Sequence, residues 1–347
     1  MHNLNKLSAI CAGKSVLITN PKDLYYLTGA AFDGFWLLIH NKKLSVITSS
    51  MVKGQVIKHF ARNAKITVTP LFTEGLIELC KKNNIINLGL DAANISASVF
   101  DAISKKLKKN NIKPFKILNI TKDLRAVKSK TEIKNIQTAC DITSKIYAEI
   151  KNKIKPGMTE SDIYFEIEKL FAKYKVEPSF KTIVASGPNS ANPHHVSTSR
   201  KILKNDIILI DMGCVYKGYC SDLTRVVFLG KINVQTKKIW TLVKNAHAVS
   251  LKTVKNGQKC RFVDESARLE IKKAGFADNF IHGTGHGVGL DIHEYPSVSQ
   301  KSKDILKQNM VITIEPGIYF NGKFGIRIED TVLVTKNGYK ILTNAQY

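Results

Sequence analysis

The sequence predicts two domains, an α/β layer followed by a larger α+β domain. The chain has 347 residues, which exceeds the usual size of a single domain. In its first third, short apolar runs alternate with segments of helical periodicity, a pattern typical of an α/β layer. Near residue 125 this pattern gives way to one long amphipathic segment and then to mixed strands and helices. We therefore predict domains at residues 1–124 and 125–347.

The first domain contains five predicted strands and three predicted helices. The strands are β-branched or apolar and are bounded by Asn, Pro, Lys or Gly. They are residues 15–19, 35–40, 44–48, 65–69 and 86–91. The helices carry apolar residues at helical spacing and are residues 52–60, 72–82 and 96–109.

The second domain begins with a long amphipathic helix at residues 128–154. Pro156 and Gly157 end it, because neither residue favours a continuing helix. Thr159 and Asp162 have the spacing of an N-terminal cap for the next helix. The later helices are predicted at residues 160–174, 235–255 and 261–274.

The formal charge of +25 would suit a nucleic-acid binder. Only seven of the 53 basic residues are Arg, however, and the Lys are spread through helices without interleaved aromatic residues. We interpret the charge as a solvated basic surface and expect no nucleic-acid partner.

Two further compositional features exclude other classes of protein. No apolar stretch approaches the roughly 18 residues of a membrane span, and no signal peptide is recognisable, so we expect a cytoplasmic protein without membrane contact. The six cysteines are scattered and show no CxxC spacing, so we predict reduced, buried thiols and neither a disulfide framework nor a zinc site.

The first candidate site residues are two aspartates in residues 206–229, which we predict as two apolar strands joined by a turn at 217–218. Such a turn places Asp211 opposite Thr224, and Asp222 then points to the same face. Two carboxylates this close destabilise a sheet unless a cation neutralises them or one is protonated. A metal ion is the economical explanation; two solvated carboxylates are the alternative.

A glycine-rich segment at residues 280–296 holds three of the nine histidines, His282, His286 and His293. Its alternate glycines allow the backbone to approach another group closely. The segment does not match a dinucleotide-binding loop, because Val288 replaces the third glycine of that motif. The clustering of histidines indicates a functional site.

Two glutamates follow on predicted strands. In residues 310–320 an apolar strand ends at Glu315, and in residues 323–334 Arg327 and Glu329 share one face. An ionised Glu among apolar strands needs a partner, and Arg327 alone could provide it in a plain ion pair.

Together these segments offer two Asp, two Glu and an imidazole. Carboxylate oxygens with one imidazole suit Mn, Co, Fe or Zn, and five ligands exceed the three of a usual one-metal catalytic site. The sequence therefore favours two divalent metal ions that share bridging carboxylates.

The order and spacing of these residues resemble those of the pita-bread metallopeptidases, which include methionine aminopeptidase, aminopeptidase P and prolidase. The likeness rests on the ten-residue gap between Asp211 and Asp222, on HGTGHGVG with its following HE, on IEPG and on GIRIED. The first domain is similar to a creatinase-type N domain through DLYYLTG (23–29) and DLRAVKSKTEI (123–133). The resemblance implies an α/β creatinase-type N-terminal domain plus an α+β pita-bread catalytic domain.

The resemblance also implies a role for each candidate residue. The metal ligands would be Asp211, Asp222, His286, Glu315 and Glu329, with Asp222 and Glu329 bridging. Glu315 would accept a proton from the attacking water. NPHHVST (192–198) is similar to the family segment with a substrate-facing histidine, which we place at His194, with His195 as the second candidate. The remaining residues implied to contact the substrate are His282, His293 and Arg327. The histidines implied to be catalytic are His194, His282 and His293.

The N domain favours the proline-specific branch of the family. The implied reaction is hydrolysis of the bond between an N-terminal residue and proline, by a water that two metal ions activate. Mn is the expected metal, with Co, Zn and Fe as alternatives; the expected substrates are peptides with proline in the second position, and the expected assembly is a homodimer. An Xaa-Pro dipeptidase is the alternative activity, and a non-catalytic module that binds protein or nucleic acid is a more distant one. One departure, TSSMVKGQ (48–55), where relatives often show Asp and Arg-Tyr, leaves the selection of substrate length open.

Overall fold

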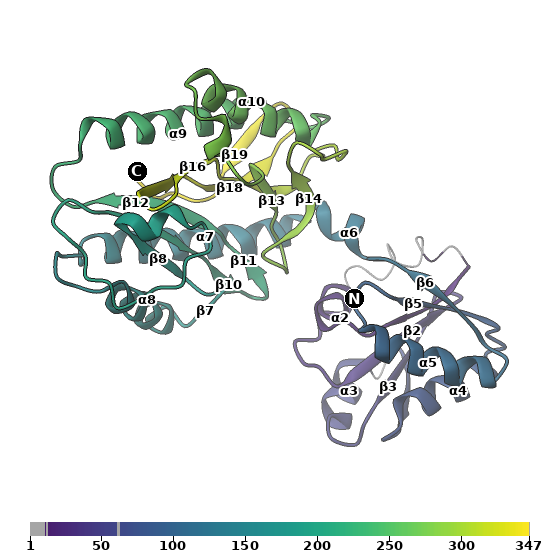
Figure 1. Cartoon of the computed structure of the whole chain (residues 1–347). Helices are drawn as coiled ribbons and strands as arrows, with labels where there is room; N and C mark the ends of the chain where they lie inside the picture. Colours follow the sequence, from purple (N-terminus) through teal and green to yellow (C-terminus); the bar gives the residue numbers. More distant parts are fainter. Residues whose placement is uncertain (1–10, 12, 61–62, 347) are drawn as a thin grey trace. The chain divides into compact units, whose positions relative to one another are not determined.

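The computed structural model describes residues 11, 13–60 and 63–346. The chain divides into two compact units, Met1–Leu124 and Arg125–Tyr347, which are coloured purple to blue and blue to yellow (Figure 1). Each unit has a hydrophobic core of its own.

The first unit contains a six-stranded sheet with the order β4-β3-β2-β1-β5-β6. Its strands are β1 (Ser15–Ile18), β2 (Phe35–His40), β3 (Lys43–Thr48), β4 (Lys65–Val68), β5 (Asn87–Asp91) and β6 (Lys113–Ile117). Its helices are α2 (Pro21–Thr28), α3 (Lys53–Phe60), α4 (Phe72–Lys82) and α5 (Ala97–Lys109), with α6 (Lys122–Ala126) at the junction. The five strands and three helices predicted for this unit are confirmed to within a residue or two.

The helices of the second unit are α7 (Lys130–Lys151), α8 (Glu160–Lys173), α9 (Val234–Thr253) and α10 (Cys260–Lys273). The predicted cap of α8 is confirmed, because the Thr159 side chain accepts from the backbone of Asp162 and the Asp162 side chain accepts from that of Thr159. All six cysteines are free and buried, as predicted. Within the described residues, no helix combines the length and the apolar character needed to span a bilayer.

The strands of the second unit form four small sheets, of order β11-β10-β7, β12-β9-β8, β14-β13-β15-β18-β19 and β16-β17. Their bounds are β7 (Glu177–Pro178), β8 (Ile183–Ser186), β9 (Ile207–Met212), β10 (Cys214–Tyr216), β11 (Tyr219–Cys220), β12 (Leu223–Phe228), β13 (Gly285–Gly287), β14 (Glu294–Val298), β15 (Val311–Ile314), β16 (Gly317–Phe320), β17 (Phe324–Arg327), β18 (Asp330–Val334) and β19 (Tyr339–Ile341).

Strand β9 is apolar on both faces because helices cover both sides of its sheet (Figure 1). Ile208 and Ile210 pack with the core that α7 and α8 line, whereas Ile207 and Leu209 pack with the core that α9 and α10 line. Successive side chains of a strand alternate between faces, so Asp211 belongs to the α9–α10 side. Strand β9 thus places the Asp211 carboxylate next to apolar side chains of the interior.

Candidate metal centre

The hairpin that holds the two aspartates has the predicted register. Asp211 on β9 pairs with Thr224 on β12, and the turn residues Lys217 and Gly218 have φ angles of 48° and 79°. Two positive φ angles define the tight turn that joins antiparallel strands. The prediction of two continuous strands was wrong, because the hairpin is interrupted at Gly213 and again just before β12, where Asp222 lies.

The predicted strand at residues 323–334 is also interrupted. β17 pairs with β16 and β18 pairs with β15, so the chain changes sheets at Ile328 and Glu329. At the change, the Glu329 N–H donates to the Thr224 carbonyl over 3.2 Å. Glu329 therefore faces the β9–β12 hairpin from a break between strands. Its side chain still lies on the same side as that of Arg327, since both contact the Thr224 hydroxyl.

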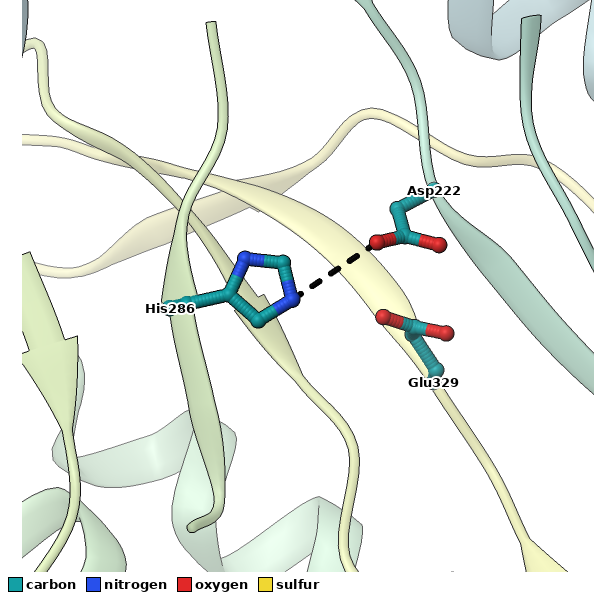
Figure 2. Close-up of side chains that lie close together, drawn as sticks. All are labelled: Asp222, His286 and Glu329. Carbon is teal, nitrogen blue, oxygen red and sulfur yellow. Dashed lines mark ion pairs between the residues drawn. The ribbon is translucent and has the colours of Figure 1, made fainter. Parts of the chain in front are cut away.

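Asp222, His286 and Glu329 meet in one cluster, in which their ligand-type atoms all lie within 4.8 Å of one another (Figure 2). His286 Nε2 is 3.7 Å from Asp222 Oδ2 and 3.4 Å from Glu315 Oε1. His286 Nδ1 lies 3.1 Å from the Gly287 carbonyl oxygen, to which it must donate. This bond leaves the Nε2 lone pair directed at the carboxylates, which is the tautomer a metal-binding histidine needs.

Arg327 connects the aspartate of β9 to the rest of the site. Its Nη2 donates to Asp211 Oδ2 over 2.6 Å, its Nη1 to the Tyr319 hydroxyl over 2.8 Å and its Nε to Thr224 Oγ1 over 3.1 Å. The Thr224 hydroxyl in turn donates to Glu329 Oε2 over 2.6 Å. Protein groups thus occupy three of the five N–H donors of a guanidinium that is almost fully buried.

The electrostatics of this cluster are unfavourable for anions without a cation. Burial, followed by the repulsion of neighbouring carboxylates, raises the pKa of Asp222 and of Glu329 well above the usual range. Burial also raises the pKa of Glu315 and lowers the pKa of His286. The centre is therefore a concentrated and largely buried set of oxygen and nitrogen lone pairs.

A cavity of about 730 Å³ brings together the nine predicted site residues and also His195, the second candidate for the substrate-facing histidine. The nine are Asp211, Asp222, His286, Glu315, Glu329, His194, His282, His293 and Arg327. The rings of His286 and His293 lie 4.3 Å apart between centroids, and His282 Nε2 lies 2.9 Å from the Tyr319 hydroxyl. His194 and His293 are exposed at the cavity, and His195, which also lines it, has its Nε2 2.8 Å from Glu160 Oε2.

The sequence reasoning missed Tyr319 and Glu160. The Tyr319 hydroxyl links Arg327 with His282, and the pairing of β16 with β17 could have indicated this neighbourhood. Glu160 was seen only as part of a helix start, and no local pattern indicates that it contacts residues 186–198.

The residues of this centre fit divalent cations. Asp211 Oδ1 is buried and has no hydrogen-bond partner, which is costly unless another group neutralises it. The donor set of carboxylate oxygens and one imidazole nitrogen is the kind that Mn, Fe, Co and Zn accept. An α/β domain followed by an α+β domain with such a centre defines a two-domain metalloenzyme.

The chain belongs to metallopeptidase family M24, whose model matches residues 134–336. The creatinase/prolidase N-terminal domain matches residues 10–127. These matches confirm the predicted creatinase-type N-terminal domain and the pita-bread catalytic domain.

Relatives are similar over nearly their whole length. An Xaa-Pro dipeptidase of Pyrococcus furiosus is 36% identical over 336 residues, which cover 95% of this chain and 93% of the relative. Among solved structures, an Xaa-Pro dipeptidase from Bacillus anthracis has a TM-score of 0.95 at 30% identity and covers 99% of this chain and 98% of its own. An X-Pro aminopeptidase from Thermotoga maritima has a TM-score of 0.90 at 32% identity, with 98% of both chains covered.

Proposed function

We propose that this protein is a metal-dependent peptidase that hydrolyses the bond between an N-terminal residue and proline. The observation that carries the proposal is the cluster of Asp222, His286 and Glu329 at the wall of a cavity that four further histidines line. Similarity to an Xaa-Pro dipeptidase and to an X-Pro aminopeptidase along almost the whole chain supports proline as the second residue of the substrate.

Two divalent metal ions would be held by the five predicted ligands, Asp211, Asp222, His286, Glu315 and Glu329. Mn is the proposed metal, with Co, Zn and Fe as alternatives, because mixed carboxylate and imidazole ligands suit all four. When bound, such ions act as Lewis acids and lower the pKa of a coordinated water.

The residues around the ligands would handle protons and orient the substrate. Glu315, whose side chain is 18% exposed at the cavity, would accept a proton from the attacking water. His293 would donate to the oxygen of the scissile carbonyl as negative charge develops there. His194 and His282 would orient the proline side, and Arg327 retains two N–H donors for a substrate carboxylate or carbonyl.

Dipeptides and longer peptides remain two candidate substrates. The Pyrococcus furiosus and Bacillus anthracis relatives are dipeptidases by name, and they favour the dipeptide. The aminopeptidase activity is the second candidate, favoured by the similarity to the Thermotoga maritima protein.

The test is turnover of an Xaa-Pro dipeptide, an Xaa-Pro-Xaa tripeptide and a dipeptide without proline, with Mn-loaded and chelated protein. Metal-dependent cleavage of both proline peptides is expected of an aminopeptidase, and cleavage of the dipeptide alone is expected of a dipeptidase. Equal cleavage of the dipeptide without proline would contradict the proposed specificity for proline. Cleavage of no peptide, together with retention on nucleic acid at moderate salt, favours the non-catalytic module.

We also propose a homodimer, a cytoplasmic location and a domain boundary between Leu124 and Arg125. The boundary is supported by the division of the chain into two compact units. The dimer rests on the family resemblance, and sedimentation analysis tests it. The location rests on the sequence composition, and cell fractionation tests it.

A further inference from the structure

The loop that carries His194 has little regular structure to hold it. It runs from Ser186, at the end of β8, to Arg200, and its only helix is the short 3-10 helix η1 (Gly187–Ala191) within these fully described residues. Contacts with neighbouring elements must therefore fix its path, because an irregular segment has no backbone ladder of its own.

A single carboxylate, that of Glu160, receives six hydrogen bonds from this loop. Oε1 accepts from Ser186 N at 2.7 Å, Ser186 Oγ at 2.8 Å and Asn189 Nδ2 at 3.0 Å. Oε2 accepts from His195 Nε2 at 2.8 Å, Thr198 N at 3.0 Å and Thr198 Oγ1 at 2.7 Å. The two oxygens thus tie the beginning of the loop to its end.

The position of Glu160 makes this arrangement stable. Glu160 is the first residue of α8, where the free N–H groups and the helix dipole favour a negative charge. The helix start also binds the loop directly, because Glu160 N donates to Arg200 O and Ser161 N donates to Thr198 O. Glu160 is 0% exposed, and a buried carboxylate is tolerated only where hydrogen bonds satisfy it.

The contacts assign different roles to the two adjacent histidines. Both histidines line the cavity, but His195 Nε2 donates to Glu160 and the His195 side chain is only 11% exposed, whereas the neighbouring His194 is exposed. His194 lies in a turn that His195 closes, because His195 N donates to Asn192 O over 3.2 Å. Fixing His195 therefore also fixes the turn that carries His194.

We propose that Glu160 is a positioning residue, which anchors His195 and Thr198 so that the loop presents His194 to the substrate cavity. Glu160 itself does not line the cavity and acts through the loop. The part that concerns the substrate rests on the proposed function, whereas the anchoring of the loop does not.

The kinetic test compares Glu160→Gln, His194→Ala and the double variant, each Mn-loaded, on an Xaa-Pro dipeptide. In Glu160→Gln an NH₂ group replaces one carboxylate oxygen and faces three N–H or O–H donors of the loop, which it cannot accept from. kcat/KM should therefore fall about tenfold, as in His194→Ala. The double variant should fall no further, because both changes remove one contact. If the two losses multiply instead, Glu160 does not act through His194 and the proposal fails.

The matched control is Asp162→Asn. Asp162 lies two residues further along the same helix end, caps the Thr159 N–H at 2.8 Å and has no hydrogen bond to the loop among the described contacts. Its kcat/KM should stay within about twofold of the unchanged protein. If Glu160→Gln fails to fold, Thr198→Val replaces it in the same comparison with His194→Ala. That variant removes one hydrogen-bond donor to the Glu160 carboxylate and keeps the side-chain shape.

Amide hydrogen exchange gives a readout that does not depend on activity. Peptides covering residues 187–199 should exchange faster in Glu160→Gln or Thr198→Val than in the unchanged protein. In Asp162→Asn their exchange rate should not change. Both results are expected with and without metal. Unchanged exchange of the loop in the Glu160 variant overturns the proposal. If the unchanged protein cleaves no Xaa-Pro peptide, the proposed function fails while the exchange experiment still decides the anchoring.

Discussion

At the scale of single residues, Asp222 places the stability of the metal-free protein in conflict with the proposed metal binding. Its carboxylate is buried beside those of Glu329 and Glu315, and this neighbourhood raises its pKa. We predict that Asp222→Asn raises the free energy of unfolding of the metal-free protein by about 1 kcal/mol or more, because it removes a buried like charge. With saturating Mn the same variant should be less stable than the unchanged protein and should lose activity.

Thermal unfolding with and without Mn measures both effects. The control is Asp206→Asn. Asp206 forms an ion pair with Arg200 at 2.6 Å, so its negative charge is stabilised by a positive one. That variant should be destabilised in both conditions. Destabilisation of the metal-free protein by Asp222→Asn would contradict the account of the carboxylate cluster.

The buried carboxylate of Glu160 should make the free energy of unfolding depend on pH. Burial alone would raise its pKa, but the hydrogen bonds from Thr198, His195, Ser186 and Asn189 lower it to about 2, from 4.5. Since the unfolded state binds the proton more readily, this stabilisation is complete above about pH 4.5 and is lost as the pH falls towards 2. A shift of this size corresponds to about 3 kcal/mol.

The measurement is urea unfolding between pH 3 and 6 for the unchanged protein and Glu160→Gln. The difference in unfolding free energy between the two should shrink as the pH falls. Parallel curves would show that the Glu160 carboxylate keeps an ordinary pKa in the folded protein.

The sequence could supply the residues of the candidate centre but not the contacts among them. Each proposed ligand lies in a short motif whose residue types are informative by themselves, as in the glycine-rich segment around His286. By contrast, Arg327 contacts Asp211 across 116 positions and Glu160 contacts Thr198 across 38, and no local spacing reports such pairs. The involvement of Arg327 with Asp211 required the tertiary structure.

At the scale of secondary structure, the β9–β12 hairpin was predictable because a two-residue turn and a period of two fix the register. Its interruption was not predictable, because it depends on a backbone contact: a Cβ at Gly213 would lie 1.9 Å from the Ser221 carbonyl oxygen. Strand β6 was missed for a local reason, since Pro114 argues against a strand interior but is tolerated at the edge of a sheet.

Gly213→Ala is therefore predicted to displace the chain next to Asp222. The added methyl group cannot fit against backbone, so we expect a loss of about 2 kcal/mol or more in unfolding free energy and weaker Mn binding. Melting curves and metal titration measure the two effects. Gly338→Ala is the control, because a Cβ there meets nothing within 4 Å and the φ angle is not left-handed; equal behaviour of the two variants would contradict the prediction.

At the scale of the whole molecule, the two units have separate cores. The core of the first unit includes Leu17, Leu38 and Leu88, and all of its buried members precede residue 125. The proposed metal ligands all belong to the second unit. A ligand stabilises only the cooperative unit that binds it, unless the units unfold together.

Metal binding should consequently protect one unit and not the other. At Mn concentrations about 100 times the dissociation constant, the stabilisation should approach about 2.7 kcal/mol for one site. Amide exchange under mildly denaturing conditions should slow in residues 125–346 on addition of Mn and stay constant in residues 63–124, and a chelator should reverse the effect. Asp222→Asn should abolish the protection in the second unit. Equal slowing in both units would mean that the chain unfolds as one cooperative unit, whatever the separation of its cores.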